Sequence, residues 1–193
     1  MKKEYTDPRT RYTQNIVKKC LLQMLSEKKL NEITVSELCK KAELTRGTFY
    51  NHFYDVYDVY ESIEEEFLSA LYSRLDKIKA YDFDNAFFKE IIKFLSQNRD
   101  FIMVIIANLG KSSLVKNMIA YACRKYMTEF GEHYPELDKN LIKTVFTFNI
   151  NGALGLLVEW MKDGMKKSPD IVADEISRFH EIILKGFFKI NES

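Results

Sequence analysis

The sequence is poor in cysteine, proline and glycine, and it contains no long apolar run. Its 193 residues include three Cys, three Pro and seven Gly. Three cysteines without paired spacing predict neither a disulfide framework nor a zinc site, and so few turn-forming residues favour long helices. The most apolar run, residues 101–107, is too short to span a bilayer. Because the amino terminus also lacks an apolar signal segment, we expect a cytoplasmic protein with no membrane-spanning segment.

The short motifs of common enzyme classes are also missing. The sequence has no nucleophile motif, no glycine-rich phosphate loop, and no paired cysteine or histidine spacing that would hold a metal. His133 lies between two glutamates in an expected loop, and His180 lies on an expected helix. Solvated or structural roles are favoured there over metal binding. We therefore expect no enzyme, no cofactor and no metal site.

The composition is that of a soluble globular protein, but its charge is unevenly distributed. Hydrophobic residues make up 46% and charged residues 30%, with a net charge of +1. Residues 1–54 hold 11 Lys/Arg and 6 Asp/Glu, whereas residues 55–193 hold 18 and 22. A basic amino-terminal segment on an acidic remainder fits a DNA-contacting head. Because chance also produces such asymmetry, it needs the support of a motif.

Residues 33–60 supply that motif, since they predict two short helices, a tight corner and the start of a third helix. Thr34 precedes Glu37 by three positions, which is a capping box. After the corner at 42–44, Thr45 can cap a second helix over 46–52, and Asp55 can cap a third. Two short helices with such a corner form a helix-turn-helix, whose second helix can enter the major groove of DNA.

The second helix carries side chains that suit DNA. Arg46 can donate two hydrogen bonds to guanine, and Thr48 can contact a base edge or a thymine methyl group. Gly47 lets the backbone approach DNA closely, at a cost of about 1 kcal/mol of helix stability. Tyr50 and His52 suit phosphate oxygens.

The segment TRGTFYNHF, followed by an acidic-capped helix, resembles the recognition helix of the TetR family of bacterial transcriptional regulators. The segment ITVSELCKKAELT resembles the preceding helix and corner, and the resemblance covers residues 9–71. GALGLLVEWMKDGMKKSPDIVADEI also resembles the C-terminal pattern of one branch of the family. The resemblance implies an all-α homodimer. Its DNA-binding domain would be residues 1–55, and its effector-binding and dimerisation domain residues 56–193.

The resemblance also assigns roles to individual residues. Arg46, Gly47 and Thr48 fall where the family touches bases. Positions that touch phosphates, or cap the helices that do, correspond to Thr34, Thr45, Tyr50 and His52. Two positions depart from the pattern. Glu43 replaces a glycine, which predicts a different corner conformation, and Val56 replaces a lysine, which predicts the loss of one phosphate contact.

The remaining sequence predicts helices and no strands. Apolar spacing, caps and breakers place the helices at 9–29, 34–41, 46–52, 55–79, 84–97, 101–109, 113–130, 135–165 and 169–190. Gly110 and Gly131 are expected to end helices, and Pro135 to begin one. A rigid helix over 55–79 would link the head to the rest, so that an effector could move the recognition helix.

The last two helices are candidates for the dimer interface. Glycines allow their close approach, and apolar stripes flank them. The candidate interface residues are Gly152, Gly155, Leu157, Phe179, Ile183 and Phe187. Packing within one chain is the alternative.

Aromatic residues of the C-terminal domain predict either an effector cavity or an ordinary core. The candidates for lining a cavity for a small apolar or aromatic effector are Phe87, Phe101, Tyr121, Phe146 and Trp160. For each of them, a place in the ordinary core is the favoured alternative. Asn149 and Asn151 lie in an apolar helix, where a polar group needs a partner.

Three functional hypotheses follow from the sequence. The first is a dimeric repressor that binds a palindromic operator and is released by a small-molecule effector. The second is a co-regulator controlled by a protein partner, which the lack of a cavity would favour. The third is a helical ligand-binding protein whose DNA-binding head has weakened, as Glu43 and Val56 would allow.

Overall fold

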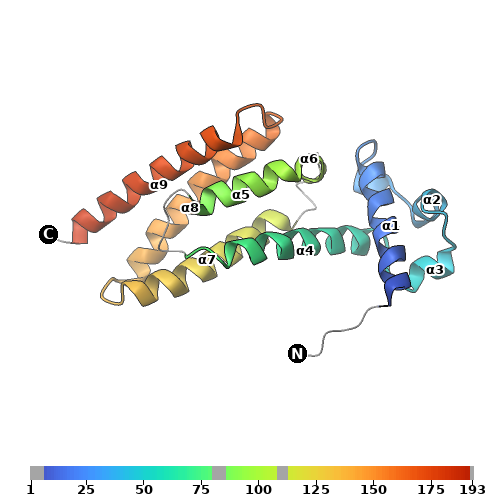
Figure 1. The fold of residues 1–193 in the computed structure, drawn as a ribbon, viewed down its shortest axis with the longest axis horizontal. Coiled ribbons are helices and arrows are strands. Elements are labelled where there is room, and N and C mark those ends of the chain that lie inside the picture. Colours follow the sequence, from blue (N-terminus) through green and yellow to red (C-terminus); the bar gives the residue numbers. More distant parts are fainter. Residues whose placement is uncertain (1–6, 80–85, 108–112, 192–193) are drawn as a thin grey trace. The chain divides into compact units, whose positions relative to one another are not determined.

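The computed structural model describes residues 7–79, 86–107 and 113–191 (Figure 1). All regular elements within these ranges are helical, and none of these residues lies in a strand. The all-α fold predicted from the sequence is therefore confirmed. The chain divides into two compact units. We call residues 1–67 with 107–113 the head unit, and residues 68–106 with 114–193 the C-terminal unit.

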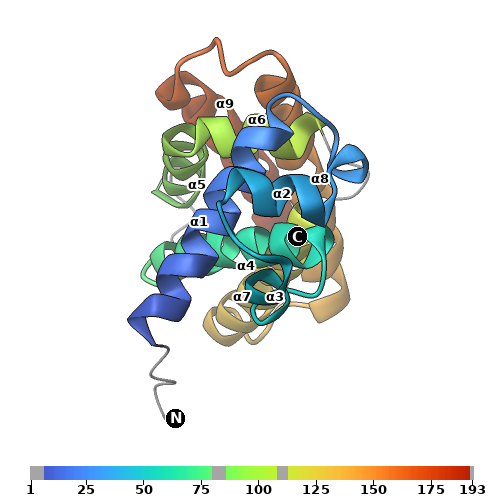
Figure 2. The same cartoon turned by 90° about the vertical axis from the view of Figure 1, so that its right-hand side faces the viewer.

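The head unit contains three helices and the first part of a fourth. These are α1 (Pro8–Leu25), α2 (Val35–Lys41), α3 (Arg46–Tyr50) and α4 (Val56–Leu75), with a 3-10 turn at Leu30–Glu32. Figure 2 looks onto α1, α2 and α3. Their apolar faces meet in a small core formed by Val17, Leu21, Leu38, Phe49, Phe53 and Val59. This core fixes how α3 is presented to solvent.

Side-chain caps set the helix boundaries in the head unit. The Glu37 backbone N–H donates to the Thr34 hydroxyl at 3.2 Å, and the Thr34 N–H donates to the Glu37 carboxylate at 3.0 Å. The Thr48 N–H donates to Thr45 Oγ1 at 3.1 Å, and the Asp58 N–H to the Asp55 carboxylate at 2.9 Å. The three caps predicted from the sequence are thus confirmed.

Two head helices are shorter than predicted. α1 ends at Leu25 because the chain then turns into the 3-10 segment. α3 ends at Tyr50, where the His52 N–H bonds to the Phe49 carbonyl at 2.9 Å and closes a tight turn. His52 therefore lies beyond the helix rather than on it.

The C-terminal unit is a helical bundle. It contains the end of α4 together with α5 (Ala86–Gln97), α6 (Arg99–Ala107), α7 (Leu114–His133), α8 (Lys139–Lys162) and α9 (Pro169–Asn191). α5 packs on α9, and α8 packs on both α7 and α9 (Figure 1). α5 is strongly amphipathic, and its buried stripe is Phe87, Phe88, Ile91, Ile92, Phe94 and Leu95.

Several predicted boundaries in this unit are wrong for identifiable reasons. α7 continues through Gly131 to His133, because one glycine costs a helix only about 1 kcal/mol. Pro135 lies in a turn, and α8 begins four residues later, where the Asp138 carboxylate accepts from the Asn140 N–H at 2.8 Å. α8 ends at Lys162 because Gly164 has a φ of 74°.

Other predicted boundaries are confirmed or lie outside the described residues. Pro169 begins α9 as predicted. The break predicted at 98–100 is confined to Asn98, because α6 begins at Arg99 and Asp100 lies within its first turn rather than capping it. The expected helix start at Asp84 and the stop at Gly110 lie outside the described residues. Among the described helices, only α8 is long and apolar enough to cross a bilayer by length and composition, a test that core helices also pass.

Candidate nucleic-acid interface

The candidate interface is the solvent-facing side of α3 and its flanking turns. Phe49 is fully buried and anchors the helix, with its ring centroid 5.9 Å from that of Phe53. Thr45, Arg46 and Gly47 are exposed at the amino-terminal end of α3, and Thr48 and His52 are partly exposed. Tyr50 is 57% exposed at its other end. The predicted base-contacting residues therefore lie at the amino-terminal end of α3, where Arg46 and Gly47 are exposed.

Hydrogen bonds hold the side chains of this end in place. The hydroxyl groups of Thr45 and Thr48 lie 2.9 Å apart, so the two side chains form one hydrogen-bonded pair. The Arg46 guanidinium donates from Nη2 to the Ser36 hydroxyl on α2. Arg46 therefore spans both helices of the motif while its other donors stay available. The sequence did not reveal this role of Ser36, because the contact depends on how α2 and α3 pack.

The corner between the two helices keeps a left-handed residue although it lacks glycine. Glu43 has a φ of 55°, and the Leu44 N–H bonds to the Cys39 carbonyl at 3.0 Å. This is the conformation that glycine adopts most readily at a helix end. The prediction that Glu43 changes the corner conformation is therefore wrong. Glu43 adopts that conformation at a steric cost of about 1–2 kcal/mol.

The start of α4 also departs from a cationic pattern. Val56 is only 4% exposed and belongs to the head core, so it contributes no polar group to the surface. Tyr54 and Tyr57 on either side of it are 84% and 41% exposed. Thr34, at the start of α2, is exposed as well. All seven residues proposed from the sequence for DNA contact thus belong to the head unit, and the contacts themselves stay predictions.

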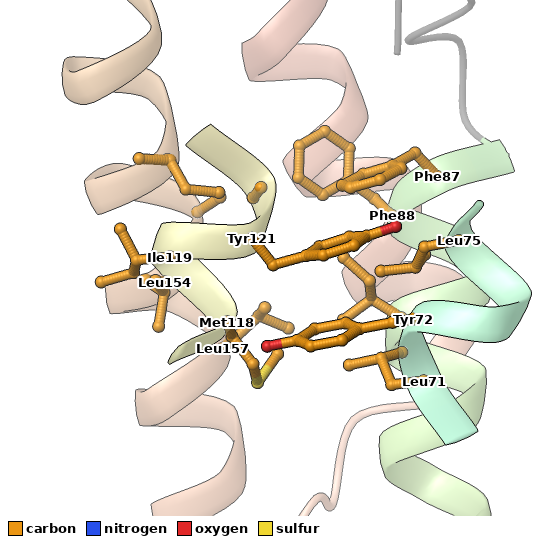
Figure 3. Close-up of a pocket in the computed structure, with 14 residues that line it drawn as sticks. Leu71, Tyr72, Leu75, Phe87, Phe88, Met118, Ile119, Tyr121, Leu154 and Leu157 are labelled. Atoms are coloured by element: carbon orange, nitrogen blue, oxygen red, sulfur yellow. The ribbon is translucent and has the colours of Figure 1, made fainter. Parts of the chain in front are cut away.

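A small apolar cavity lies within the C-terminal unit, between α4, α5, α7 and α8. Its volume is about 30 Å³. It is lined by Leu71, Tyr72, Leu75, Phe87, Phe88, Ile91, Met118, Ile119, Tyr121, Ala122, Ile150, Ala153, Leu154 and Leu157 (Figure 3). A space of this size holds about one water molecule, whereas pockets for small ligands usually measure roughly 300–1,000 Å³.

Two of the five residues predicted to line a cavity do so. Phe87 and Tyr121 face the cavity, whereas the other three lie elsewhere. Phe146 packs on Tyr126, with ring centroids 4.6 Å apart, and the Trp160 indole donates to the Lys167 carbonyl at 2.9 Å. Phe101 is partly buried on α6 and does not line the cavity.

Two tyrosines stack along one side of this cavity. The rings of Tyr72 and Tyr121 are nearly parallel, with centroids 4.0 Å apart (Figure 3). The Tyr121 hydroxyl donates to the Asp76 carboxylate at 2.5 Å. Burial, and then this hydrogen bond, raise the pKa of Tyr121, so the phenol stays neutral at physiological pH.

The candidate dimer residues divide between surface and interior. Gly152 and Gly155 are exposed on α8, and Phe179 is 58% exposed on α9. Leu157 is 5% exposed and lines the cavity, and Ile183 is partly buried. The side chain of Phe187 lies outside the described residues. Further exposed apolar side chains on the same two helices are Phe148 and Leu156 on α8, and Ile171 and Ile182 on α9.

The candidate DNA-contacting residues lie in the head unit, and the cavity lies in the C-terminal unit. Residues 85–181, half of the chain, match the TetR-type model of the transcriptional regulator C-terminal region. The chain belongs to the TetR family of transcriptional regulators. The resemblance to this family, which the sequence analysis based mainly on residues 9–71, is therefore confirmed by a match over residues 85–181. Membership of a family of transcriptional regulators implies DNA binding.

Two solved structures are similar to this TetR-family regulator over nearly its whole length. The dihydroxyacetone kinase operon activator DhaS is 16% identical, with a TM-score of 0.64 over 90% of this chain and 96% of its own. The fatty acid degradation regulator FadR from Bacillus halodurans is 16% identical, with a TM-score of 0.62 over 95% of this chain and 98% of its own. At these identities the likeness shows the fold alone. A comparison with curated proteins finds no match.

A buried polar pair lies between α8 and α9 of this TetR-family regulator. The Asn149 amide hydrogen-bonds to His180 Nδ1, and the two residues are 8% and 3% exposed. Burial lowers the pKa of His180 from 6.5 to about 4, so the imidazole is neutral at physiological pH. The Asn151 amide donates to the Thr147 carbonyl at 2.7 Å. Both asparagines thus have partners within the chain, and the described residues contain no cluster that would hold a metal.

Proposed function

We propose that this TetR-family regulator is a cytoplasmic homodimer that binds a palindromic operator, with α3 of each subunit in a major groove. A dimer with two recognition helices suits two half-sites separated by about one helical turn. The observation that carries this proposal is the amphipathic placement of α3. Its Phe49 is fully buried, whereas Arg46 and Gly47 face solvent.

The roles of the seven head residues follow from their positions. Arg46, Gly47 and Thr48 lie at the amino-terminal end of α3, which is the end that reads base edges in such motifs. Thr45 holds Thr48 by hydrogen bonding. The remaining polar groups, Thr34, Tyr50 and His52, are assigned to phosphates or to capping.

The dimer is proposed to form through exposed apolar side chains of α8 and α9. Phe148 is 72% and Phe179 is 58% exposed in the single chain. Exposed Gly152 and Gly155 would let the helices of a second subunit approach closely. Such a face is costly in water and is typical of an interface between subunits.

Regulation is proposed to be repression relieved by a small apolar or aromatic effector bound in the C-terminal unit. The cavity lined by Phe87 and Tyr121 is the proposed site. At about 30 Å³ it must widen to admit such a ligand. An effector shifts the regulator only if it binds one arrangement of the two heads more tightly than the other.

The small size of the cavity also favours a second candidate, in which a protein partner controls the regulator. A partner would bind a surface and would need no internal space. The two candidates differ in a thermal-shift screen of small apolar and aromatic compounds. Stabilisation that Leu157→Trp abolishes, by filling the cavity, would support the small effector. A screen without stabilising compounds, together with capture of a partner that weakens operator binding, would support the second.

Selection of binding sites from a random duplex library tests the DNA-binding proposal. The selection should be run at about physiological salt, because phosphate contacts depend on salt. Recovery of a palindrome is expected. If folded dimeric protein recovers no sequence, the proposal fails, and a head that has lost DNA binding becomes the better interpretation. A reporter gene under the recovered operator would then separate repression from activation.

A further inference from the structure

The large exposed side chains of this protein differ in chemistry between its two units. Among the described residues of the head unit, the exposed large aromatic side chains are all tyrosines, namely Tyr12, Tyr50, Tyr54 and Tyr57, at 70%, 57%, 84% and 41% exposure. The exposed large apolar residues described in the C-terminal unit have no polar atom in their side chains, and they are Phe148, Leu156, Ile171, Phe179 and Ile182. A tyrosine offers a hydroxyl donor together with an apolar ring. The head surface therefore suits a partner that accepts hydrogen bonds.

The recognition segment has few cations with which to bind phosphates. Residues 42–60 contain one arginine, and they contain three carboxylates in Glu43, Asp55 and Asp58. The one guanidinium, of Arg46, is assigned to base recognition and also bonds to Ser36. Phosphate contacts from this segment must therefore come chiefly from uncharged donors.

Tyr54 is the most exposed of the four tyrosines, and its backbone is held in place. Its N–H donates to the Asp58 carboxylate at 2.7 Å, and the Asp58 N–H donates to the Asp55 carboxylate at 2.9 Å. The preceding Phe53 is 5% exposed and belongs to the core. The chain thus fixes the backbone of Tyr54 one residue after a core anchor and leaves its ring in solvent.

We propose that Tyr54 is a further DNA-contacting residue, whose phenol hydroxyl donates to a backbone phosphate without bringing a positive charge. This inference rests on the proposed function, in which α3 enters the major groove. Tyr54 follows α3 by four residues, beyond the end of the helix that reads bases. Because the amino-terminal residues of a recognition helix are the ones that contact base edges, a contact from beyond its other end is assigned to the DNA backbone.

An uncharged phosphate contact has a distinct thermodynamic signature. A lysine or arginine that neutralises a phosphate releases a counterion, and each such contact adds about 0.9 to the slope of log affinity against log salt. A phenol hydroxyl releases no counterion. Removing it should therefore lower affinity at every salt concentration and leave the slope unchanged.

The test compares Tyr54→Phe, Tyr54→Lys and the wild-type protein on the selected operator and on random duplex, over a range of salt concentrations. Tyr54→Phe removes one oxygen from an exposed ring, so folding should be unaffected. Its affinity should fall on the order of tenfold for the dimer on both DNAs, because each subunit loses one hydrogen bond. Tyr54→Lys should steepen the salt slope by about 2, one contact per subunit. The control Tyr134→Phe removes a phenol hydroxyl in the C-terminal unit and should change neither quantity.

The remaining outcomes distinguish failure of this inference from failure of the proposed function. If Thr48→Ala weakens operator binding but Tyr54→Phe does not, the DNA-binding proposal stands and the role of Tyr54 is overturned. If Tyr54→Phe weakens binding to the operator alone, Tyr54 reads sequence, and the phosphate assignment is overturned. If the wild-type protein binds neither DNA, the proposed function fails, and the inference about Tyr54 fails because it depends on that function.

Discussion

Glu43 shows how one residue can satisfy a backbone requirement against its own preference. The corner of the helix-turn-helix needs a left-handed residue, and Glu43 supplies it at a φ of 55°. Its side chain is exposed, so no contact with the core forces this choice of residue. The strain is therefore removable without loss of packing.

Replacing Glu43 by glycine should stabilise the protein. Relief of the left-handed conformation is worth about 1–2 kcal/mol, and the added freedom of glycine in the unfolded chain returns roughly 0.4–1 kcal/mol. A net gain of about 0.5–1 kcal/mol in the free energy of unfolding is expected from urea titration of the full chain. Glu43→Gln keeps the strain and removes the charge, so it serves as the control. Equal stability of the two variants would contradict the role of strain.

His180 should make the stability of the fold sensitive to acid. Its pKa is about 4 in the folded protein because of burial, and 6.5 is the ordinary value expected in the unfolded chain. The unfolded chain therefore binds the proton first, so stability is constant above pH 6.5 and falls as the pH drops from 6.5 to 4. The full effect is about 3 kcal/mol. Urea titrations at pH 7, 5.5 and 4 should show a smaller loss for His180→Gln than for the wild type, and parallel losses would rule out His180 as the source.

Thr48 and Tyr50 should contribute differently to DNA binding. Thr48→Ala is expected to weaken binding to the operator by about 1–3 kcal/mol while changing binding to random duplex little, because base contacts carry specificity. Tyr50→Ala should weaken both, because phosphate contacts do not depend on sequence. Fluorescence anisotropy with both duplexes measures the two effects. Equal losses on both DNAs for both variants would refute this division of roles.

At the scale of elements, α8 should depend on a cap that lies after the proline. The Asp138 carboxylate accepts from the Asn140 N–H, so Asp138→Ala removes the cap and should cost about 1 kcal/mol in the free energy of unfolding. Glu136→Ala, which removes an equal charge from the same loop, is the control and should cost much less. If the two variants are equally stable, α8 does not rely on this cap.

The sequence predicted elements best where signals are local. Thr34 with Glu37 and Thr45 with Thr48 are three residues apart, so their caps follow from spacing alone. Pro135 and Asp138 are both acceptable helix starts by local signals, and α8 begins after the second. Contacts between elements, such as that of Arg46 with Ser36, depend on the angle at which the helices cross, and local sequence patterns do not predict that angle.

At the scale of the whole molecule, the same limit applies to the cavity. The aromatic content indicated either core or pocket, and both occur. Phe87 and Tyr121 line a space of about 30 Å³, whereas Phe146 and Trp160 have packing and hydrogen-bonding partners elsewhere. Whether an aromatic ring faces a neighbour or a gap is decided by the volumes of all surrounding side chains. Periodicity along one helix does not contain that information.

The proposed dimer rests on apolar side chains that a single chain leaves exposed. Phe148 and Phe179 expose most of their surface, on two helices that pack together. Placing a charge at either position would bury that charge in the dimer at a cost of several kcal/mol, but it costs the isolated chain little. We expect sedimentation velocity at micromolar concentration to give a dimer for the wild type and a monomer for Phe179→Glu, with unchanged helical circular dichroism.

Tyr57→Glu is the matched control for this prediction, because it places the same charge at an exposed aromatic residue of the head unit. It should remain dimeric. Phe179→Glu should also lose affinity for the palindrome far more than for a single half-site. In a dimer, binding of one subunit holds the second close to its own half-site, and a monomer lacks this effect. A wild-type monomer at micromolar concentration would contradict the interface. A dimer that persists in Phe179→Glu would mean that the subunits meet through another surface, and the spacing of the two recognition helices would then have to be derived from that surface.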